Sequence, residues 1–163
     1  MAKEIKAPNP YKTDGFTIFL GGAIDQGEAE DWQAKVVEAL EDLDVTILNP
    51  RRDNWDSSWE QDIENKEFRQ QVEWELKAQE DASLVIYVLL EDSKGPVTML
   101  EIGHFAPDKD AVLCIEEGFY RQGNLDIFAK RYKIPIYHDF DEMLDDLHEI
   151  LKALKTLRKL PED

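Results

Sequence analysis

The chain has 163 residues, a length that suits one domain with a buried core. Its 36 acidic and 19 basic residues give a formal net charge of −17 at pH 7. Such a charge repels phosphate backbones and anionic lipid, so it disfavours binding to nucleic acid or to a membrane. The single cysteine, Cys114, excludes an intrachain disulfide and a cysteine-based zinc site.

Residues 1–14 contain Pro8 and Pro10 and are expected to form an extended N-terminal arm. A single α/β domain is expected to follow over residues 15–163. Met1 is not followed by an apolar targeting segment, and the sequence has no run of about 18 apolar residues. These features predict a cytoplasmic protein.

From Phe16 onwards, the apolar pattern predicts a strand followed by a helix five times. The run 83–90 is apolar on both faces, as is typical of an interior parallel strand. The helices show apolar residues three or four positions apart, which marks one buried stripe on each. The predicted strands cover 16–22, 45–48, 83–90, 111–115 and 134–137, and the predicted helices cover 32–43, 68–76, 97–106, 124–132 and 143–154.

This alternation predicts a doubly wound parallel sheet of five strands with helices on both faces, as in flavodoxin-like folds. We expect the strand order 2-1-3-4-5. Ligands of such sheets bind beyond the carboxyl ends of the strands, near the switch in strand order. The loops after Gly22, Leu48, Leu90 and Ile115 are therefore the expected site.

Glu101 is the candidate nucleophile among the carboxylates near these strand ends. The sequence lacks a dinucleotide or P-loop glycine motif, a nucleophile-elbow serine motif and a zinc-protease motif, and its three histidines show no metal spacing, so we expect no metal and no cofactor. Glu101 would lie in the first turns of a helix, where the helix dipole favours the ionised form, and an ionised, desolvated carboxylate can act as a nucleophile. The alternative is that Glu101 has no catalytic role and is simply a charged residue near the start of a helix.

Three further positions have both a functional and a structural interpretation. Asp81 precedes the third predicted strand and could serve the site or simply end a helix or turn. Gly21 and Gly22 could let a ligand approach the backbone closely, or could form a plain tight turn.

Four segments resemble the nucleoside 2-deoxyribosyltransferases, in particular a divergent branch of that family. A fifth segment, 123–125, follows the fourth strand, and together they span residues 18 to 125. The order and spacing of the segments on the predicted loops make the set more specific than any one of them. The four are 18–25 (IFLGGAID), 49–52 (NPRR), 80–83 (EDAS) and 99–103 (MLEIG).

The resemblance implies a role for each matching residue. Glu101 matches the glutamate that attacks the anomeric carbon, and Asp81 matches an aspartate that positions the catalytic groups or handles the proton at the base. Asn124 matches a residue that reaches the site of a neighbouring subunit, which implies a homo-oligomer with shared sites. The expected substrate-binding residues are Phe19, Gly22, Ile24, Asp25, Asn49, Arg51, Trp55 and Asn124.

Two positions depart from the family pattern. A first-strand tyrosine found in many members is Phe19 here, so its hydroxyl contact to the nucleophile is lost. A second acidic residue, six positions before the nucleophile, is Gly95 here, although Asp92 or Ser93 lies nearby. Recognition of the base is therefore left open.

The resemblance implies transfer of 2-deoxyribose between nucleobases by a retaining double displacement through a deoxyribosyl ester of Glu101. The expected partners are small molecules, namely deoxynucleosides and free nucleobases. One alternative is an N-glycosidase acting on 2′-deoxynucleosides or their 5′-monophosphates. A non-catalytic nucleoside-binding module on the same fold is the other.

Overall fold

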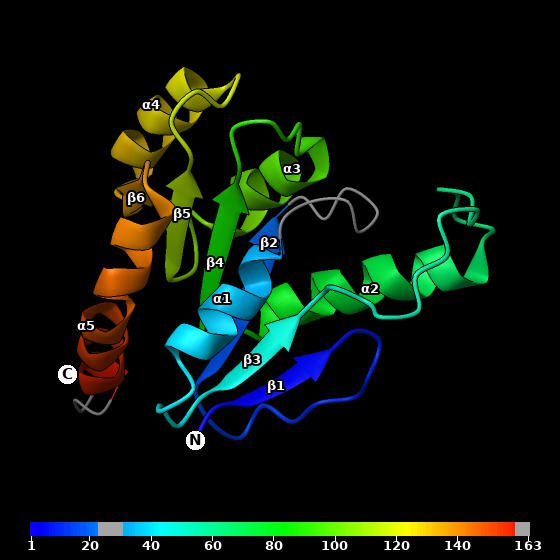
Figure 1. Ribbon diagram of the computed structural model, residues 1–163, viewed down its shortest axis with the longest axis horizontal. Coiled ribbons are helices and arrows are strands. Elements are labelled where there is room, and N and C mark those ends of the chain that lie inside the picture. Colours follow the sequence, from blue (N-terminus) through cyan, green and yellow to red (C-terminus); the bar gives the residue numbers. More distant parts are fainter. Residues whose placement is uncertain (23–30, 159–163) are drawn as a thin grey trace.

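The computed structural model describes residues 1–22 and 31–158, which form one parallel six-stranded sheet covered by helices on both faces (Figure 1). The strand order is β1-β3-β2-β4-β5-β6, and every neighbouring pair is parallel. The strands are β1 (Lys3–Lys6), β2 (Thr17–Gly22), β3 (Thr46–Asn49), β4 (Leu84–Leu89), β5 (Ala111–Ile115) and β6 (Ile136–Tyr137). The helices are α1 (Trp32–Ala39), α2 (Lys66–Asp81), α3 (Pro96–Phe105), α4 (Gln122–Tyr132) and α5 (Phe140–Arg158).

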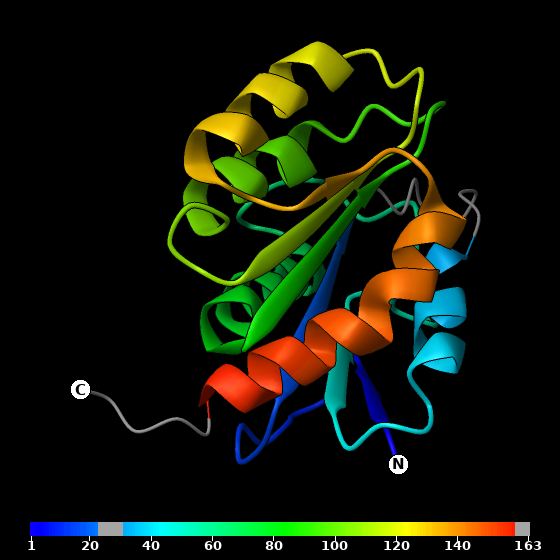
Figure 2. The same ribbon diagram turned by 90° about the vertical axis from the view of Figure 1, so that its left-hand side faces the viewer.

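Alternating side chains of the central strands divide the core into two layers. Helices α2, α3 and α4 cover the face that carries Phe19, Tyr87 and Leu113. Helices α1 and α5 cover the opposite face, which carries Leu20 and Ile86 (Figure 2). Both faces of β4 are fully buried, as expected for an interior parallel strand.

The predicted flavodoxin-like order is confirmed, because the five expected strands lie in the order 2-1-3-4-5 as β3-β2-β4-β5-β6. The expected strand count was one too low. Residues 3–6 of the supposed arm pair in parallel with Thr46–Asn49 and add an edge strand. The rest of the arm is also held, since the Tyr11 hydroxyl donates to Asp81 and the Trp74 indole donates to the Asn9 carbonyl.

Cys114 is buried in β5, as its apolar surroundings indicate. Within residues 1–22 and 31–158, every helix is too short or too polar to cross a lipid bilayer.

Candidate functional site

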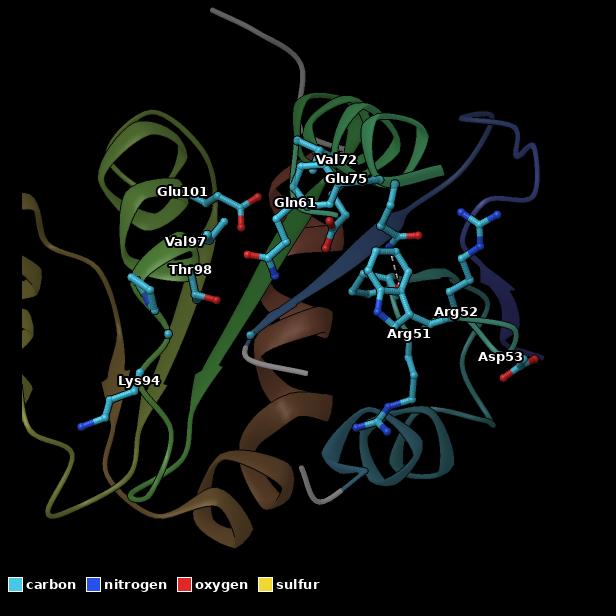
Figure 3. A pocket seen from close by; sticks show the side chains of 17 residues that line it. Arg51, Arg52, Asp53, Gln61, Val72, Glu75, Lys94, Val97, Thr98 and Glu101 are labelled. Carbon is cyan, nitrogen blue, oxygen red and sulfur yellow. Dashed lines mark hydrogen bonds between the residues drawn. The ribbon is translucent and has the colours of Figure 1, made fainter. Parts of the chain in front are cut away.

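A cavity of about 830 Å³ opens beyond the carboxyl ends of β2, β3 and β4, where the strand order changes direction (Figure 3). Its walls come from the end of β2, the segment after β3, one face of α2 and the first turns of α3. The predicted location of the site at these strand ends therefore coincides with a real cavity. The lining residues are Gly22, Pro50, Arg51, Arg52, Asp53, Trp55, Gln61, Phe68, Gln71, Val72, Glu75, Lys94, Gly95, Pro96, Val97, Thr98 and Glu101.

Glu101 lies in the second turn of α3 and lines this cavity. Helix α3 begins at Pro96, directly after Gly95, whose φ of 56° is in the left-handed region. The helix dipole acts mainly within the first turn, so it contributes little at Glu101. Burial instead raises the pKa of Glu101, and a hydrogen bond from the Gln79 side chain to its Oε2 partly opposes this effect. The expectation of an ionised carboxylate now depends on Gln79 rather than on the dipole.

Glu75 is the second carboxylate in the cavity, and sequence reasoning did not identify it. It projects from α2 near Glu101, as Figure 3 shows. Burial, together with the negative charge of Glu101, raises the pKa of Glu75 from its ordinary value of 4.5 to about 8. At neutral pH Glu75 therefore holds a proton.

A sequence signal for Glu75 lies in the spacing of the polar residues on α2. Gln71, Glu75 and Gln79 are four residues apart, so they share one face of the helix. Both glutamines are buried. The predicted apolar stripe of this helix is divided, because Phe68 and Val72 line the cavity whereas Leu76 is exposed. A polar stripe with buried amides indicates a helix face that borders a site rather than solvent.

The structure does not bring Asp81 to the cavity. Asp81 is the last residue of α2, six residues beyond Glu75, which corresponds to about 9 Å along the helix. Its carboxylate accepts a hydrogen bond from the Tyr11 hydroxyl at 2.8 Å and forms an ion pair with Lys77 at 3.1 Å. The Tyr11 bond ties the N-terminal segment to α2, whereas the Lys77 ion pair lies within α2, and both contacts are structural.

The segment after β3 contributes Arg51 and Trp55 to the cavity, but not Asn49. Asn49 is buried and shapes the turn, since its Oδ1 accepts from the Arg51 backbone and its Nδ2 donates to Glu4. Arg51 donates to Gln33 and lies 3.4 Å from Asp31. The Trp55 ring forms an edge contact with Trp59 and offers an aromatic wall.

Strand β2, the first strand predicted from the sequence, contributes only Gly22 to the cavity lining. Phe19 is buried in the core against Trp74. A Cβ on Gly21 would lie 2.5 Å from the Tyr87 ring, and one on Gly22 would lie 2.6 Å from the Trp32 ring. The groups that approach the backbone closely at these two glycines are therefore the rings of Tyr87 and Trp32. Ile24 and Asp25 lie outside the described residues.

Asn124 is exposed on α4 and is not among the residues that line the cavity of its own chain. Its expected contact with a neighbouring subunit's site stays a prediction. Among the residues that the structure describes, no group of three histidine, cysteine, aspartate or glutamate side chains is arranged to hold a metal ion.

Residues 15–119 match the family model described as nucleoside 2-deoxyribosyltransferase like. This range includes the whole cavity lining and covers most of the chain. No curated protein sequence matches closely enough to name a relative.

Proposed function

Because the chain belongs to the nucleoside 2-deoxyribosyltransferase-like family, we propose that it moves 2-deoxyribose from one nucleobase to another, with Glu101 as the nucleophile. The observation that carries this proposal is the pair formed by Glu101 and Glu75 in one cavity at the switch in strand order. A retaining transfer needs one ionised carboxylate at C1′ and one proton donor at the departing base. The two glutamates divide these roles.

The proposed reaction has two displacements at the same carbon. An oxygen of Glu101 attacks C1′ as the bond from C1′ to the base nitrogen breaks, and the leaving base receives the proton of Glu75. The product is a deoxyribosyl ester of Glu101 and a Glu75 carboxylate. An incoming base then gives its N–H proton to Glu75, bonds to C1′ and releases Glu101. Two inversions give net retention, and the negative charge of Glu101 stabilises the oxocarbenium-like transition states.

The remaining lining fits a nucleobase next to the two carboxylates. Trp55, Phe68 and Val72 supply apolar and aromatic surface, and the volume of about 830 Å³ lies in the range of small-molecule sites. Gln71 adds a polar contact point. Its Nε2 is held by the Pro50 carbonyl at 2.8 Å, and its Oε1 has no hydrogen-bond partner among the described residues. That oxygen is buried, so it meets an N–H group of the base only when the Gln71 side chain turns toward the cavity.

A transfer assay tests the proposal. The protein is mixed with thymidine or deoxyinosine and free adenine, and the formation of deoxyadenosine is followed by chromatography. Release of free base without deoxyadenosine would favour an N-glycosidase, and binding without turnover would favour a nucleoside-binding module. Adenosine in place of a deoxynucleoside should react more slowly, because a 2′-hydroxyl withdraws electrons from the cation that develops at C1′.

The net charge of −17 predicts that 5′-monophosphates are poorer substrates than nucleosides. The cavity does contain Arg51, Arg52 and Lys94. However, Arg51 is engaged by Gln33 and Asp31, and Arg52 donates to Asn54 and lies over the Trp59 ring. We expect kcat/KM for deoxyadenosine monophosphate to be about tenfold below that for deoxyadenosine, which corresponds to about 1.4 kcal/mol of repulsion.

The ratio of kcat/KM for deoxyadenosine monophosphate to that for deoxyadenosine should approach one as salt is added, because salt screens the repulsion between the phosphate and the protein. Faster cleavage of the monophosphate would overturn the nucleoside assignment. It would instead favour the nucleotide N-glycosidase, with the three cations as the phosphate site.

The exposed position of Asn124 supports the proposal that it serves the site of a neighbouring subunit. We expect a homo-oligomer in sedimentation experiments. Asn124→Ala should then lower kcat/KM without changing the thermal stability of the isolated chain. A fully active monomer would contradict this expectation.

A further inference from the structure

Gln79 is a fully buried side chain behind the nucleophile and does not line the cavity. Its amide has three polar neighbours. Nε2 donates to the Glu75 backbone carbonyl at 3.1 Å and also to the carboxylate Oε2 of Glu101. Oε1 accepts from the Tyr87 hydroxyl at 2.7 Å. Both N–H groups of the amide, and one of the two acceptor positions on its oxygen, are therefore occupied by protein groups.

The chemistry of these neighbours fixes the orientation of the amide. The Glu75 carbonyl and the Glu101 carboxylate are acceptors, so both require the NH₂ end of Gln79. Tyr87 is fully buried, and burial together with the charge of Glu101 raises the pKa of its hydroxyl, so it stays protonated and donates. A flipped amide would place its oxygen against two acceptors, which costs two buried hydrogen bonds.

The position of Tyr87 follows from the register of the sheet. Gly21 on β2 is paired with Tyr87 on β4, and a Cβ on Gly21 would lie 2.7 Å or less from two atoms of the Tyr87 ring. Gly21 therefore leaves the space that this ring occupies. Phe19, two residues earlier on the same strand, has no hydroxyl, so the contact to the nucleophile comes from β4 through α2.

We propose that Tyr87 and Gln79 form a positioning relay that holds Oε2 of Glu101, leaves its other oxygen free to attack, and keeps the negative charge on Glu101 rather than on Glu75. The catalytic role of this relay rests on the proposed function. Its effect on the pKa values of the two carboxyl groups is independent of that function. Glu75 accepts no comparable side-chain hydrogen bond within the described part of the chain. Glu75 is also the more deeply buried of the two, which favours its protonated form, and the Gln79 N–H adds to this preference by stabilising the negative charge on Glu101.

The other charged groups around Glu101 do not distinguish between Glu75 and Glu101 as the holder of the proton. Arg51, Arg52, Asp53 and Lys94 line the cavity shared by both carboxyl groups, and His104 is exposed further along α3. Tyr87 is neutral. Within residues 1–22 and 31–158, the Gln79 amide is the only side chain with a hydrogen bond to the carboxylate of one glutamate and not to that of the other.

The test follows the side-chain amide protons of Gln79 and the carboxyl carbons of Glu75 and Glu101 by NMR across a pH titration of the full chain. In the wild-type protein, one Gln79 proton should shift with the titration of Glu101, and this shift should vanish in Glu101→Gln. In Gln79→Met, which keeps the length of the side chain, the pKa of Glu101 should rise by about one unit or more. The pKa of Glu75 should fall.

Tyr87→Phe should also raise the pKa of Glu101 and lower the pKa of Glu75, but by less than Gln79→Met does. In this variant the Gln79 amide loses the hydrogen bond from Tyr87 but keeps its N–H groups. Tyr137→Phe is the matched control, since it removes a tyrosine hydroxyl that bonds to Asp146 away from the cavity. A Gln79 proton that ignores the Glu101 titration in the wild-type protein would overturn the relay, even if no variant folds. So would an unchanged Glu101 pKa in folded Gln79→Met.

The same variants separate the relay from the proposed reaction. If transfer occurs, Gln79→Met should lower kcat by about tenfold or more with little change in KM, and the acid limb of its pH profile should move upward. Altered titrations without any transfer activity would support the relay and refute the transferase.

Discussion

Replacing Glu101 with glutamine is expected to reduce transfer by at least about 10³-fold, because the variant has no carboxylate to form the ester at C1′. The substitution preserves size, and the new amide oxygen can still accept from Gln79. Burial raises the pKa of Glu101, so a neutral side chain is not penalised at this position. The expected variant is folded, binds nucleosides and is inactive.

Initial rates of deoxyadenosine formation measure the loss, and circular dichroism checks the fold. Mass spectrometry of the wild-type protein quenched during turnover should show the added mass of one deoxyribosyl group, which Glu101→Gln should lack. Transfer at a near wild-type rate by a folded variant would remove Glu101 from the nucleophile role.

The strand–helix alternation predicted the sheet because each central strand carries a run of apolar residues that only a parallel, doubly covered sheet can bury. The edge strand β1 gave no such signal. Its four residues, Lys3–Lys6, include three charged side chains and pair with β3 through backbone hydrogen bonds. An edge strand of this kind depends on a neighbour distant in sequence, so local pattern does not reveal it.

Site residues were predictable from the sequence where they follow a strand. They were not predictable where tertiary packing decides whether a side chain faces the cavity. Gly22 ends β2 and Glu101 lies early in the helix that follows β4, and both line the cavity. Asp81 also adjoins a strand, but it precedes β4 and therefore lies toward the amino end of the sheet. Glu75 is a glutamate in a mostly polar helix, for which a solvated face is the ordinary interpretation. It faces the site only because α3 and the segment after β3 close the cavity around it.

Replacing Glu75 with glutamine should produce the second large effect, a fall in kcat of about 10² to 10⁴-fold for bases that need a proton to leave. A chemically activated nucleoside, whose base leaves without protonation, should be affected much less in its first step. In the wild-type protein, activity should fall as pH rises through about 8, where Glu75 loses its proton. Asp81→Asn is the matched control, because it neutralises a carboxylate of the same helix outside the cavity.

The same substitution should stabilise the fold, because the raised pKa of Glu75 means that the folded state binds its proton more tightly than the unfolded state. The contribution of this group to stability is greatest below 4.5 and is lost as pH rises from there to about 8. Glutamine does not titrate, so Glu75→Gln should not lose stability in this way. Its melting temperature should exceed that of the wild-type protein by a margin that grows from pH 4.5 to about 8 and stays constant at higher pH. Loss of activity with a gain in stability is the pattern of a group kept for chemistry. A variant with normal pH dependence and unchanged rates would show that Glu75 is not the proton donor.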